Sequence, residues 1–472
     1  MKLGLLLRCK KKLAELEIKG ITNDSRKVNK DYAFVNTCGK IEYDFDALDN
    51  GAAVIITPND LQKENAIKVD NISEIFALMS AKWFSDPAKK LKLIGVTGTN
   101  GKTSVTYMLK AILEKAGKKV GLIGTNQNMI GNKIIPSINT TPNAYYLNEL
   151  FYKMEQDNCE YVVMEVSSHS LSNGHTVGLD FEVGVFTNLT QDHLDFHGDM
   201  EAYFNAKKKL FLQCKTAVLN ADDTYFSRLS QEIDCKKVTY SVDGTSDFIA
   251  KAVNCLATHT EYKLLTDNEL LHIDVNTGGN FTVYNSLCAI SAASQIGVDI
   301  NVLKKALADF SGVKGRAEVI PNTGDFTVII DYAHTPDGLK NILKTFKACA
   351  KERLILLFGC GGDRDKTKRA QMGEIASIYA DYVIVTSDNP RTENPHEIID
   401  DIMKGIPNGL FSGKIIEDRY EAIKFALSIA QKDDIIILAG KGHEDYQIIG
   451  KEKHPFDERE IIKSLLANCL IK

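Results

Sequence analysis

The sequence lacks the features of a secreted or membrane-embedded protein. Its ten cysteines are scattered, with no CxxC pair and no Cys/His cluster at zinc-ligand spacing, which is typical of reduced thiols in a cytosolic protein. The longest apolar runs, such as Leu354–Phe358, have the length of a strand and are too short to cross a bilayer. Lysines at Lys10–Lys12 interrupt the leucines near the start, so we expect no signal peptide. The sequence therefore predicts a cytoplasmic protein without membrane insertion.

Two further absences narrow the class of protein. The formal net charge of -5 gives no excess of positive charge for a nucleic-acid partner, and we expect none. No internal repeat or low-complexity tract is present, which excludes a solenoid. What remains is a protein in the ordinary soluble globular range, with 44% apolar and 25% charged residues.

Short β-rich runs alternate with helical patterns through most of the chain, which predicts α/β domains with parallel sheets. At 472 residues the chain is too long for one hydrophobic core. A Pro/Lys-containing stretch at Ser85–Lys90 and a Gly/Lys/Arg stretch at Ser311–Arg316 predict boundaries between three domains, over residues 1–88, 89–312 and 313–472. The expected strands are Leu93–Val96, Val120–Gly124, Tyr161–Met164 and Gly184–Phe186 in the central domain, and Phe326–Ile330, Leu354–Phe358, Tyr382–Thr386 and Asp434–Ala439 in the third.

A glycine-rich loop follows the first central strand and opens a helical pattern. Glycines let backbone N–H groups converge on phosphate oxygens, and the helix N-terminus adds positive charge. Lys102 would reach the β- and γ-phosphates, and the Thr103 hydroxyl would bind Mg²⁺. The spacing is a variant of the common pattern, with Val96 in place of a glycine. The expected ATP-binding residues of the loop are Gly98, Thr99, Asn100, Gly101, Lys102, Thr103 and Ser104. This predicts a central P-loop ATPase domain with a doubly wound sheet. The loop does not identify the reaction, so a kinase, a motor protein and a ligase all remain possible.

Carboxylate and imidazole groups follow two other expected strands. Glu165 ends one strand, and His193 lies in a loop after the next. The carboxyl ends of strands are where an open α/β sheet binds its ligands. Magnesium with phosphates requires one or two carboxylates. Glu165 is therefore a candidate ligand of Mg²⁺, with His193 as a second-metal ligand.

Ten motifs occur together in one order along the chain: GTNGKTS, NTTP, MEVSSHSL, FTNLTQDHLDFHGD, VLNADD, GRAE, DYAHTPD, FGCGGDRDKTKR, DNPR and GKGHEDYQ. With these motifs the sequence resembles the Mur ligase family. Within the family it resembles the ligases that add the third residue of the peptidoglycan stem to UDP-MurNAc-L-Ala-D-Glu. The resemblance implies a Rossmann-like third domain that binds the added amino acid and an N-terminal domain that binds the UDP-sugar.

The resemblance also implies the reaction and its catalytic groups. ATP would convert a carboxylate into an acyl phosphate, which an amino group then attacks to form an amide. Lys207 would be carbamylated and would hold Mg²⁺ together with Thr103, Glu165 and His193. The expected catalytic residues are Lys102, Lys207, His193 and Glu165. Of the remaining ATP contacts, Asn285 would meet adenine, Arg316 and Asp331 would meet phosphate and ribose, and His334 would complete the nucleotide pocket.

The substrates implied by the resemblance are ATP, the UDP-MurNAc-dipeptide and an amino acid. The resemblance implies a set of residues that contact this UDP-MurNAc-dipeptide acceptor. They are Ser25, Arg26, Asn139, Thr140, Thr141, Ser167, Asn173 and His175. The DNPR motif resembles that of enzymes that take meso-diaminopimelate, since relatives that take L-lysine lack its arginine. Diaminopimelate has one more carboxylate than lysine, and a guanidinium can bind a carboxylate bidentately. The residues expected at this amino acid are Arg364, Asp388, Asn389, Pro390, Arg391, Gly440 and Glu444.

The match departs from the family in places, and several alternatives stay open. Gly39–Phe45 lacks the usual GxxxDG-type pattern, and His175 stands where an arginine is usual. The chain could add L-lysine or use a modified acceptor. A folylpolyglutamate synthetase-like ligase shares the same ATP chemistry, and a catalytically silent scaffold could bind the nucleotide sugar. An association with other cell-wall precursor enzymes is also open.

Overall fold

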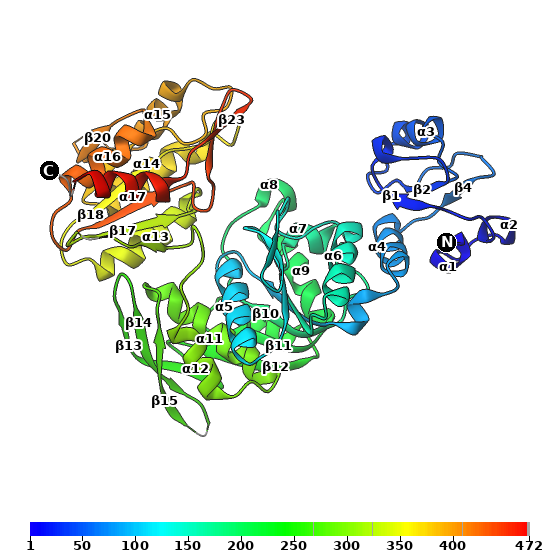
Figure 1. Ribbon diagram of the computed structural model, residues 1–472, viewed down its shortest axis with the longest axis horizontal. Coiled ribbons are helices and arrows are strands. Elements are labelled where there is room, and N and C mark those ends of the chain that lie inside the picture. Colours follow the sequence, from blue (N-terminus) through cyan, green and yellow to red (C-terminus); the bar gives the residue numbers. More distant parts are fainter. Residues whose placement is uncertain (268, 323, 408, 470–472) are drawn as a thin grey trace. The chain divides into compact units, whose positions relative to one another are not determined.

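The structure is a computed structural model that describes residues 1–267, 269–322, 324–407 and 409–469. The chain divides into two compact units. Figure 1 labels the helices and strands along the chain. Unit 1 comprises residues 1–240 and 288–299, and unit 2 comprises residues 241–287 and 300–472. The division passes through one helix, α11 (Asn280–Gln295). No helix among the described residues has both the length and the apolar character needed to span a membrane.

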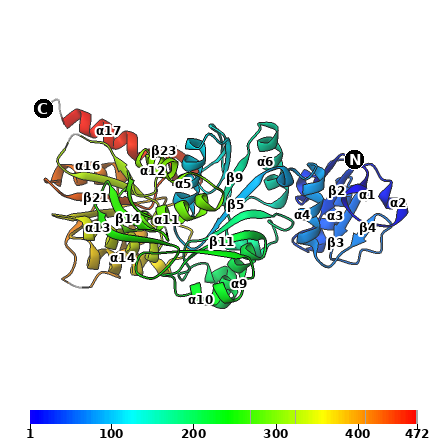
Figure 2. The same cartoon turned by 90° about the horizontal axis from the view of Figure 1, so that it is seen from below.

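Unit 1 begins with a small parallel sheet, shown in blue in Figure 2. Its strands lie in sequence order, and their apolar side chains pack on helix α4 and on the N-terminal turns. The strands are β1 (Gly20–Thr22), β2 (Tyr32–Val35), β3 (Val54–Thr57) and β4 (Ala66–Lys68). The helices are α1 (Leu3–Leu6), α2 (Lys11–Ala14), α3 (Ile41–Asp49) and α4 (Ile72–Trp83), with 3₁₀ turns η1 (Ser25–Lys27) and η2 (Pro87–Lys90).

The larger sheet of unit 1 has the strand order β12-β11-β10-β5-β9-β6-β7-β8. The strands are β5 (Lys92–Thr97), β6 (Val120–Ile123), β7 (Asn128–Ile130), β8 (Lys133–Ile135), β9 (Tyr161–Glu165), β10 (Phe181–Phe186), β11 (Cys214–Asn220) and β12 (Lys236–Ser241). The first six in spatial order run parallel, and β7 and β8 form an antiparallel edge. Helices are α5 (Lys102–Lys115), α6 (Ala144–Gln156), α7 (Ser168–Ser172), α8 (Leu194–His197), α9 (Met200–Lys208) and α10 (Phe226–Gln231), with the turn η3 (Lys209–Leu212).

Strand register places the functional loops of unit 1 at one edge of this sheet. β5 is paired on both sides, with Val96 opposite Glu165 of β9 and Thr97 opposite Phe186 of β10. The strands are buried, apolar runs of the kind expected for a sheet covered on both faces. Because three parallel strands end at the same level, the loops that follow them are neighbours.

Unit 2 contains an antiparallel meander of β13 (Phe248–Cys255), β14 (Thr260–Leu265) and β15 (Leu270–Val275), followed by α12 (Ile300–Ala308). Its main sheet has the order β16-β17-β21-β18-β19-β20, parallel except for β16. These strands are β16 (Glu318–Ile320), β17 (Thr327–Asp331), β18 (Leu354–Phe358), β19 (Tyr382–Val385), β20 (Gly413–Ile415) and β21 (Ile435–Ala439). A hairpin of β22 (Tyr446–Ile449) and β23 (Glu452–Pro455) follows.

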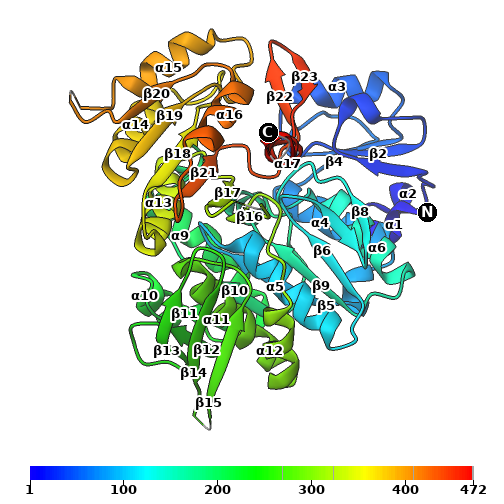
Figure 3. The same cartoon turned by 60° about the vertical axis from the view of Figure 1, so that its left-hand side comes forward.

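Helices cover both faces of the main sheet of unit 2, as Figure 3 shows for α13 and α14 on one side and α16 on the other. One apolar cluster joins the sheet to α13 (Pro336–Cys349), α14 (Thr367–Tyr379) and α15 (Pro395–Met403). A second joins its other face to α16 (Arg419–Ile429) and α17 (Glu458–Cys469). The expected α/β class is confirmed, with a doubly wound central sheet and a Rossmann-like C-terminal sheet, and each expected strand is present within a few residues of its predicted ends.

Candidate active site

The glycine-rich loop joins β5 to α5 and depends on glycine at two positions. Gly98 has φ +150°, and a Cβ there would lie 1.8 Å from the Thr187 hydroxyl oxygen. Gly101 has φ +86° at the N-cap of α5. The Lys102 ammonium donates to the Gly98 and Thr99 carbonyls, at 2.8 Å each. Thr103 is buried in the first turn of α5, and Ser104 beside it is half-buried. The loop has the backbone form that a phosphate cradle requires.

The loop after β10 holds the glycine-rich loop in place. The Asn100 N–H donates to the Asn188 side-chain oxygen at 2.9 Å, and the Thr99 N–H donates to the Asn188 carbonyl at 2.9 Å. The Thr187 hydroxyl donates to the Asn100 carbonyl at 2.6 Å. Asn220, at the end of β11, donates in turn to the Thr187 carbonyl at 2.8 Å. These bracing residues were not identified from the sequence, although their place directly after buried strands is a signal that could have identified them.

Lys207, on α9, is almost completely buried, with 3% of its surface exposed. Its amine donates to the Gly98 carbonyl at 2.8 Å and lies 4.6 Å from the centre of the Tyr203 ring. Burial lowers the pKa of Lys207 well below its ordinary value, and the nearby Lys102 ammonium lowers it further. The structure therefore brings Lys102 and Lys207 to the same carbonyl oxygen and favours the neutral amine at Lys207.

Glu165, at the end of β9, is buried and accepts two hydrogen bonds from Thr125. The backbone N–H and the hydroxyl of Thr125 each lie 2.9 Å from a Glu165 carboxylate oxygen. The Thr125 hydroxyl also lies 3.0 Å from that of Thr140. Thr141 donates to the Glu165 carbonyl at 2.9 Å and accepts from the Ser167 N–H at 3.0 Å. Thr140, Thr141, Ser167 and Glu165 are thus brought together, whereas Asn139 is exposed beside them.

His193 lies at the N-cap of α8, with φ +54°, in a cluster of rings. Its ring centre is 4.8 Å from that of His169 and 6.1 Å from that of Tyr203. Burial is the largest cause of a lowered pKa at His193, while the Asp192 carboxylate, 3.4 Å away, opposes it. The cluster therefore favours neutral imidazole, the form that binds metals.

No group of three His, Cys, Asp or Glu side chains in the described ranges is arranged to hold a metal ion. Magnesium is commonly held by one or two carboxylates together with the phosphates of its substrate, rather than by a cage of protein ligands. Glu165 and Thr103 supply hard oxygen donors of the type that Mg²⁺ prefers. The residues present fit a magnesium ion that arrives with a nucleotide.

The remaining acceptor candidates lie elsewhere in unit 1. Ser25 and Arg26 form η1 after β1; Ser25 is buried, whereas Arg26 is exposed and pairs with Asp24 at 2.9 Å. Asn173 caps the end of α7 and is exposed. Burial lowers the pKa of His175, and a hydrogen bond with the Pro142 carbonyl opposes this shift. The imidazole ring of His175 is therefore favoured in its neutral form, which can donate a hydrogen bond to an anion but carries no charge.

Three expected nucleotide contacts gather around Tyr332 in unit 2. Asp331 accepts from the backbone N–H groups of Ala317 at 2.7 Å and Ala333 at 2.8 Å, and burial raises the pKa of Asp331. The Arg316 guanidinium lies 4.8 Å from the centre of the Tyr332 ring. His334 Nδ1 lies 2.8 Å from the Tyr332 carbonyl. Asn285 is buried on α11 of the same unit. Tyr332 was not identified from the sequence.

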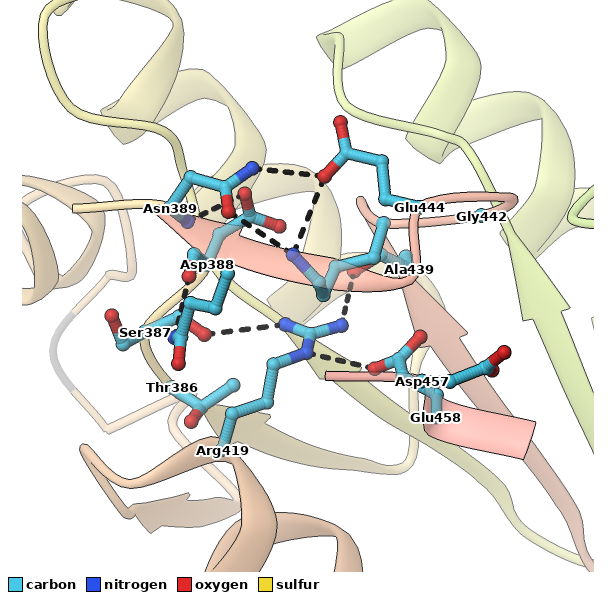
Figure 4. Close-up of polar contacts among 12 residues, drawn as sticks. Thr386, Ser387, Asp388, Asn389, Arg419, Ala439, Gly442, Glu444, Asp457 and Glu458 are labelled. Atoms are coloured by element: carbon cyan, nitrogen blue, oxygen red, sulfur yellow. Dashed lines mark hydrogen bonds and ion pairs between the residues drawn. The ribbon is translucent and has the colours of Figure 1, made fainter. Parts of the chain in front are cut away.

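The loops after β19 and β21 form a second polar cluster in unit 2, shown in Figure 4. The Asn389 amide donates to a Glu444 carboxylate oxygen at 2.9 Å. The Lys441 ammonium, which has no exposed surface, lies 3.1 Å from the Asn389 side-chain oxygen and 3.3 Å from the same Glu444 oxygen. Sequence reasoning missed Lys441, because nothing in its motif indicates burial.

Asp388 and Gly440 face each other in this cluster. A Cβ at Gly440, which has φ +111°, would lie 2.8 Å from a carboxylate oxygen of Asp388. That oxygen, Oδ2, is buried and has no hydrogen-bond partner within the described part of the chain. The other, Oδ1, accepts from the Asn389 N–H at 2.7 Å. The close approach explains why glycine follows β21.

Arg391 adopts φ +51°, a left-handed conformation that is uncommon for arginine. Its N–H donates to the Ile448 carbonyl at 3.1 Å, and its guanidinium donates to the Gly362 carbonyl at 2.8 Å. Arg364 is exposed in the loop that contains Gly362, and buried Pro390 precedes Arg391. The backbone contacts hold the Arg391 side chain beside this loop, half-buried, where it can pair with an anionic group.

Comparison with known proteins identifies relatives along almost the whole chain. Residues 96–293 match the Mur ligase middle domain, and residues 315–442 match the Mur ligase, glutamate ligase domain. The chain is 47% identical to the UDP-N-acetylmuramoyl-L-alanyl-D-glutamate--2,6-diaminopimelate ligase of Caldanaerobacter subterraneus subsp. tengcongensis, covering 96% of this chain and 95% of that protein. A solved structure of a UDP-N-acetylmuramoyl-L-alanyl-D-glutamate--2,6-diaminopimelate ligase is 32% identical, with a TM-score of 0.72, and covers 98% of this chain and 97% of its own.

The fold is shared with more distant ligases. Folylpolyglutamate synthase of Mycobacterium tuberculosis, solved with ADP and AMPPCP, has a TM-score of 0.65 over 84% of this chain and 94% of that chain. Its sequence identity is 17%, so this likeness concerns the fold alone.

Replacing Gly98 tests the glycine-rich loop. Gly98→Ala forces a Cβ into the Thr187 hydroxyl, and we expect a loss of about 3 kcal/mol in the free energy of unfolding, with loss of ATP binding. The matched control is Gly117→Ala, at φ +78° with nothing within 4 Å, which should cost about 1 kcal/mol and leave ATP binding intact. Thermal unfolding and calorimetric titration with ATP measure both. Equal effects of the two variants would show that the close approach does not shape the loop.

Proposed function

From the membership of this chain in the Mur ligase family, we propose that it is an ATP-dependent ligase that joins meso-2,6-diaminopimelate to the D-glutamyl γ-carboxylate of UDP-MurNAc-L-Ala-D-Glu. The observation that carries the proposal is the 47% identity to a ligase of that name over nearly the full length of both chains. Arg391, which follows Asn389 by two residues, and Glu444, which Asn389 contacts, support it, because they offer a cation and a carboxylate for the far end of the added amino acid. The nucleotide substrates favour a cytoplasmic reaction.

In the first step, an oxygen of the γ-carboxylate attacks the γ-phosphorus of ATP. A P–O bond forms to the carboxylate, the bond to the β-phosphate oxygen breaks, and ADP leaves. Backbone N–H groups at the start of α5, in residues 101–104, would hold the phosphates, and the Lys102 ammonium would neutralise charge that develops on the transferring group. Phosphoryl transfer of this type depends mainly on positioning and electrostatics.

Lys207 would contribute as a carbamate. A neutral amine attacks the carbon of CO₂, and loss of one proton leaves a carboxylate-like anion. The lowered pKa of Lys207 supports this modification, because only the neutral amine is nucleophilic. The carbamate, Glu165, Thr103 and His193 would hold Mg²⁺, which when bound offsets negative charge on the phosphates. The anion would also attract the neighbouring Lys102 ammonium, which a protonated Lys207 would repel.

In the second step, a neutral amino group of diaminopimelate attacks the acyl carbon. The carbon–oxygen bond to phosphate breaks, inorganic phosphate leaves, and the nitrogen loses a proton to give the amide. Arg391 would pair with the distal carboxylate of diaminopimelate, and Glu444 would accept from the ammonium group at the same end. Lysine lacks that carboxylate and would leave Arg391 without its partner.

Phosphate release tests the proposal directly. Wild-type protein is incubated with ATP, Mg²⁺ and UDP-MurNAc-L-Ala-D-Glu, with meso-diaminopimelate, with L-lysine or with neither. We expect release only with diaminopimelate, together with a UDP-MurNAc-tripeptide detected by mass. Release with L-lysine instead would overturn the assignment of diaminopimelate as the added amino acid. In a separate mixture, folate and glutamate replace the UDP-MurNAc-dipeptide and the amino acid, and release there would indicate the folylpolyglutamate reaction. Absence of release with all of these would indicate a nucleotide-sugar-binding scaffold or a different acceptor.

Arg391→Asn tests the selection of diaminopimelate. Asparagine tolerates the positive φ at this position, so the change removes the guanidinium without straining the backbone. We expect the KM for diaminopimelate to rise about 10- to 100-fold, the value of a hydrogen bond to a charged group, with little change in the KM for ATP. Asp433→Asn, another position of unit 2 with positive φ, is the control. An unchanged KM for diaminopimelate would rule out Arg391 as its carboxylate partner.

Lys207→Met tests the carbamate and predicts opposite effects on activity and stability. Activity should be lost, whereas Lys208→Met, at a half-buried lysine that pairs with Glu232, should retain it. In bicarbonate-free buffer at pH 7, the unfolded chain binds a proton at Lys207 that the folded chain releases. Wild-type stability therefore rises with pH toward the ordinary lysine pKa of 10.5.

We expect the Tm of Lys207→Met to equal or exceed that of wild type at pH 7, with the difference shrinking as pH rises. Added bicarbonate should raise wild-type activity and add the mass of CO₂ to the peptide that contains Lys207. An active Lys207→Met enzyme would eliminate the carbamate from the mechanism.

A further inference from the structure

Arg419 is a fully buried arginine at the first position of α16, outside every motif of the proposed site. A cation at a helix N-terminus opposes the helix dipole, and a buried ion pair often adds little net stability. Stability alone therefore gives a weak reason for arginine here. The contacts that its guanidinium makes give a better one.

The Arg419 guanidinium bonds three groups, which Figure 4 shows together. It donates to the Glu458 carboxylate at 2.8 Å, to the Ala439 carbonyl at 3.0 Å and to the Ser387 carbonyl at 3.4 Å. Glu458 begins α17 and is also fully buried. One side chain thus joins the ends of β19 and β21.

The sheet itself does not join these two strand ends directly, because β18 lies between β19 and β21. Their extensions nevertheless supply the two halves of the polar cluster. Asn389 lies two residues after Ser387, and Glu444 lies five residues after Ala439. The 2.9 Å bond between Asn389 and Glu444 requires the two extensions to keep a fixed separation.

We propose that Arg419 is a positioning residue for amino-acid selection, which sets the separation between the segment with Asn389 and Arg391 and the segment with Gly440 and Glu444. Glu458 neutralises and orients the guanidinium. The inference rests on the proposed function in that the cluster binds the added amino acid. Arg419 itself does not touch the substrate in this account, and acts only through the two backbone carbonyls.

The test removes both members of the Arg419–Glu458 ion pair, so that neither charge is left buried without its partner. Arg419→Met combined with Glu458→Met replaces both side chains by apolar ones of similar volume, which buried ion pairs generally tolerate. The matched control is Arg353→Met combined with Asp434→Asn. That pair, 2.6 Å apart, lies directly before β18 and β21, at the opposite ends of the strands. Arg419→Lys keeps the charge but loses the planar set of donors.

We expect the Arg419/Glu458 double variant to raise the KM for diaminopimelate about 10- to 100-fold through misplacement of the cluster, with the KM for ATP within about twofold of wild type. Arg419→Lys should give a smaller rise. The control should leave both KM values unchanged, even if its Tm falls. An unchanged KM for diaminopimelate in the double variant, or an equal rise in the control, would overturn the proposal.

A second measurement does not depend on activity. Hydrogen exchange should become faster at the backbone amides of residues 387–391 and 440–448 in the double variant, and stay at the wild-type rate there in the control. If wild-type protein turned out to be inactive with diaminopimelate, the proposed function would fail, while faster exchange confined to these segments would still uphold the link. Unchanged exchange in both segments would reject the link, whatever the substrate.

Discussion

The Gly98 carbonyl oxygen accepts hydrogen bonds from two lysine side chains, Lys102 and Lys207, and the arrangement of the glycine-rich loop against α9 depends on that contact. The carbonyl is available because Gly98 turns the chain where any side chain would meet Thr187. Lys102 comes from the adjacent helix and Lys207 from a helix more than a hundred residues further along the chain. Two cations at one acceptor repel each other, so the site favours a state in which Lys207 is neutral or converted into an anion.

The two units use the same architectural principle for different chemistry. In unit 1, strands β5, β9 and β10 end side by side. The glycine-rich loop follows β5, Glu165 ends β9, and His193 lies in the loop after β10. In unit 2, β18, β19 and β21 end side by side, and their loops carry Gly362, Asn389 and Glu444. Under the proposed function, the phosphate chemistry belongs to one sheet and the selection of the amino acid to the other.

Much of the fold follows from the sequence, because the parallel strands are continuous buried runs of branched apolar residues. Leu354–Phe358 coincides with β18, and Gly98–Ser104 marks the phosphate loop by its glycines and lysine. The meander β13–β15 was not predicted, since its strands alternate exposed and buried positions and lie beside polar turns.

The side chains that support the site were harder to predict than the site itself. Asn188 and Lys441 act through partners 88 and 52 residues away in the chain, and the local sequence shows neither their burial nor their bonds. Arg419 is harder still, because it stands at an ordinary helix start in a segment with no motif. Contacts set by tertiary packing leave no periodic or spacing signal in a single sequence.

The left-handed backbone at Arg391 restricts how this protein can evolve a new substrate. Its φ of +51° and the hydrogen bonds of its N–H and carbonyl groups to the β22 hairpin fix the main chain at that position. β-Branched replacements such as valine or isoleucine are strained there, whereas asparagine, aspartate, histidine and glycine fit. A lineage that abandoned the second carboxylate of its amino acid would therefore pass most readily through those four residues. A wider choice of side chain at this position would first require the hairpin to be rebuilt.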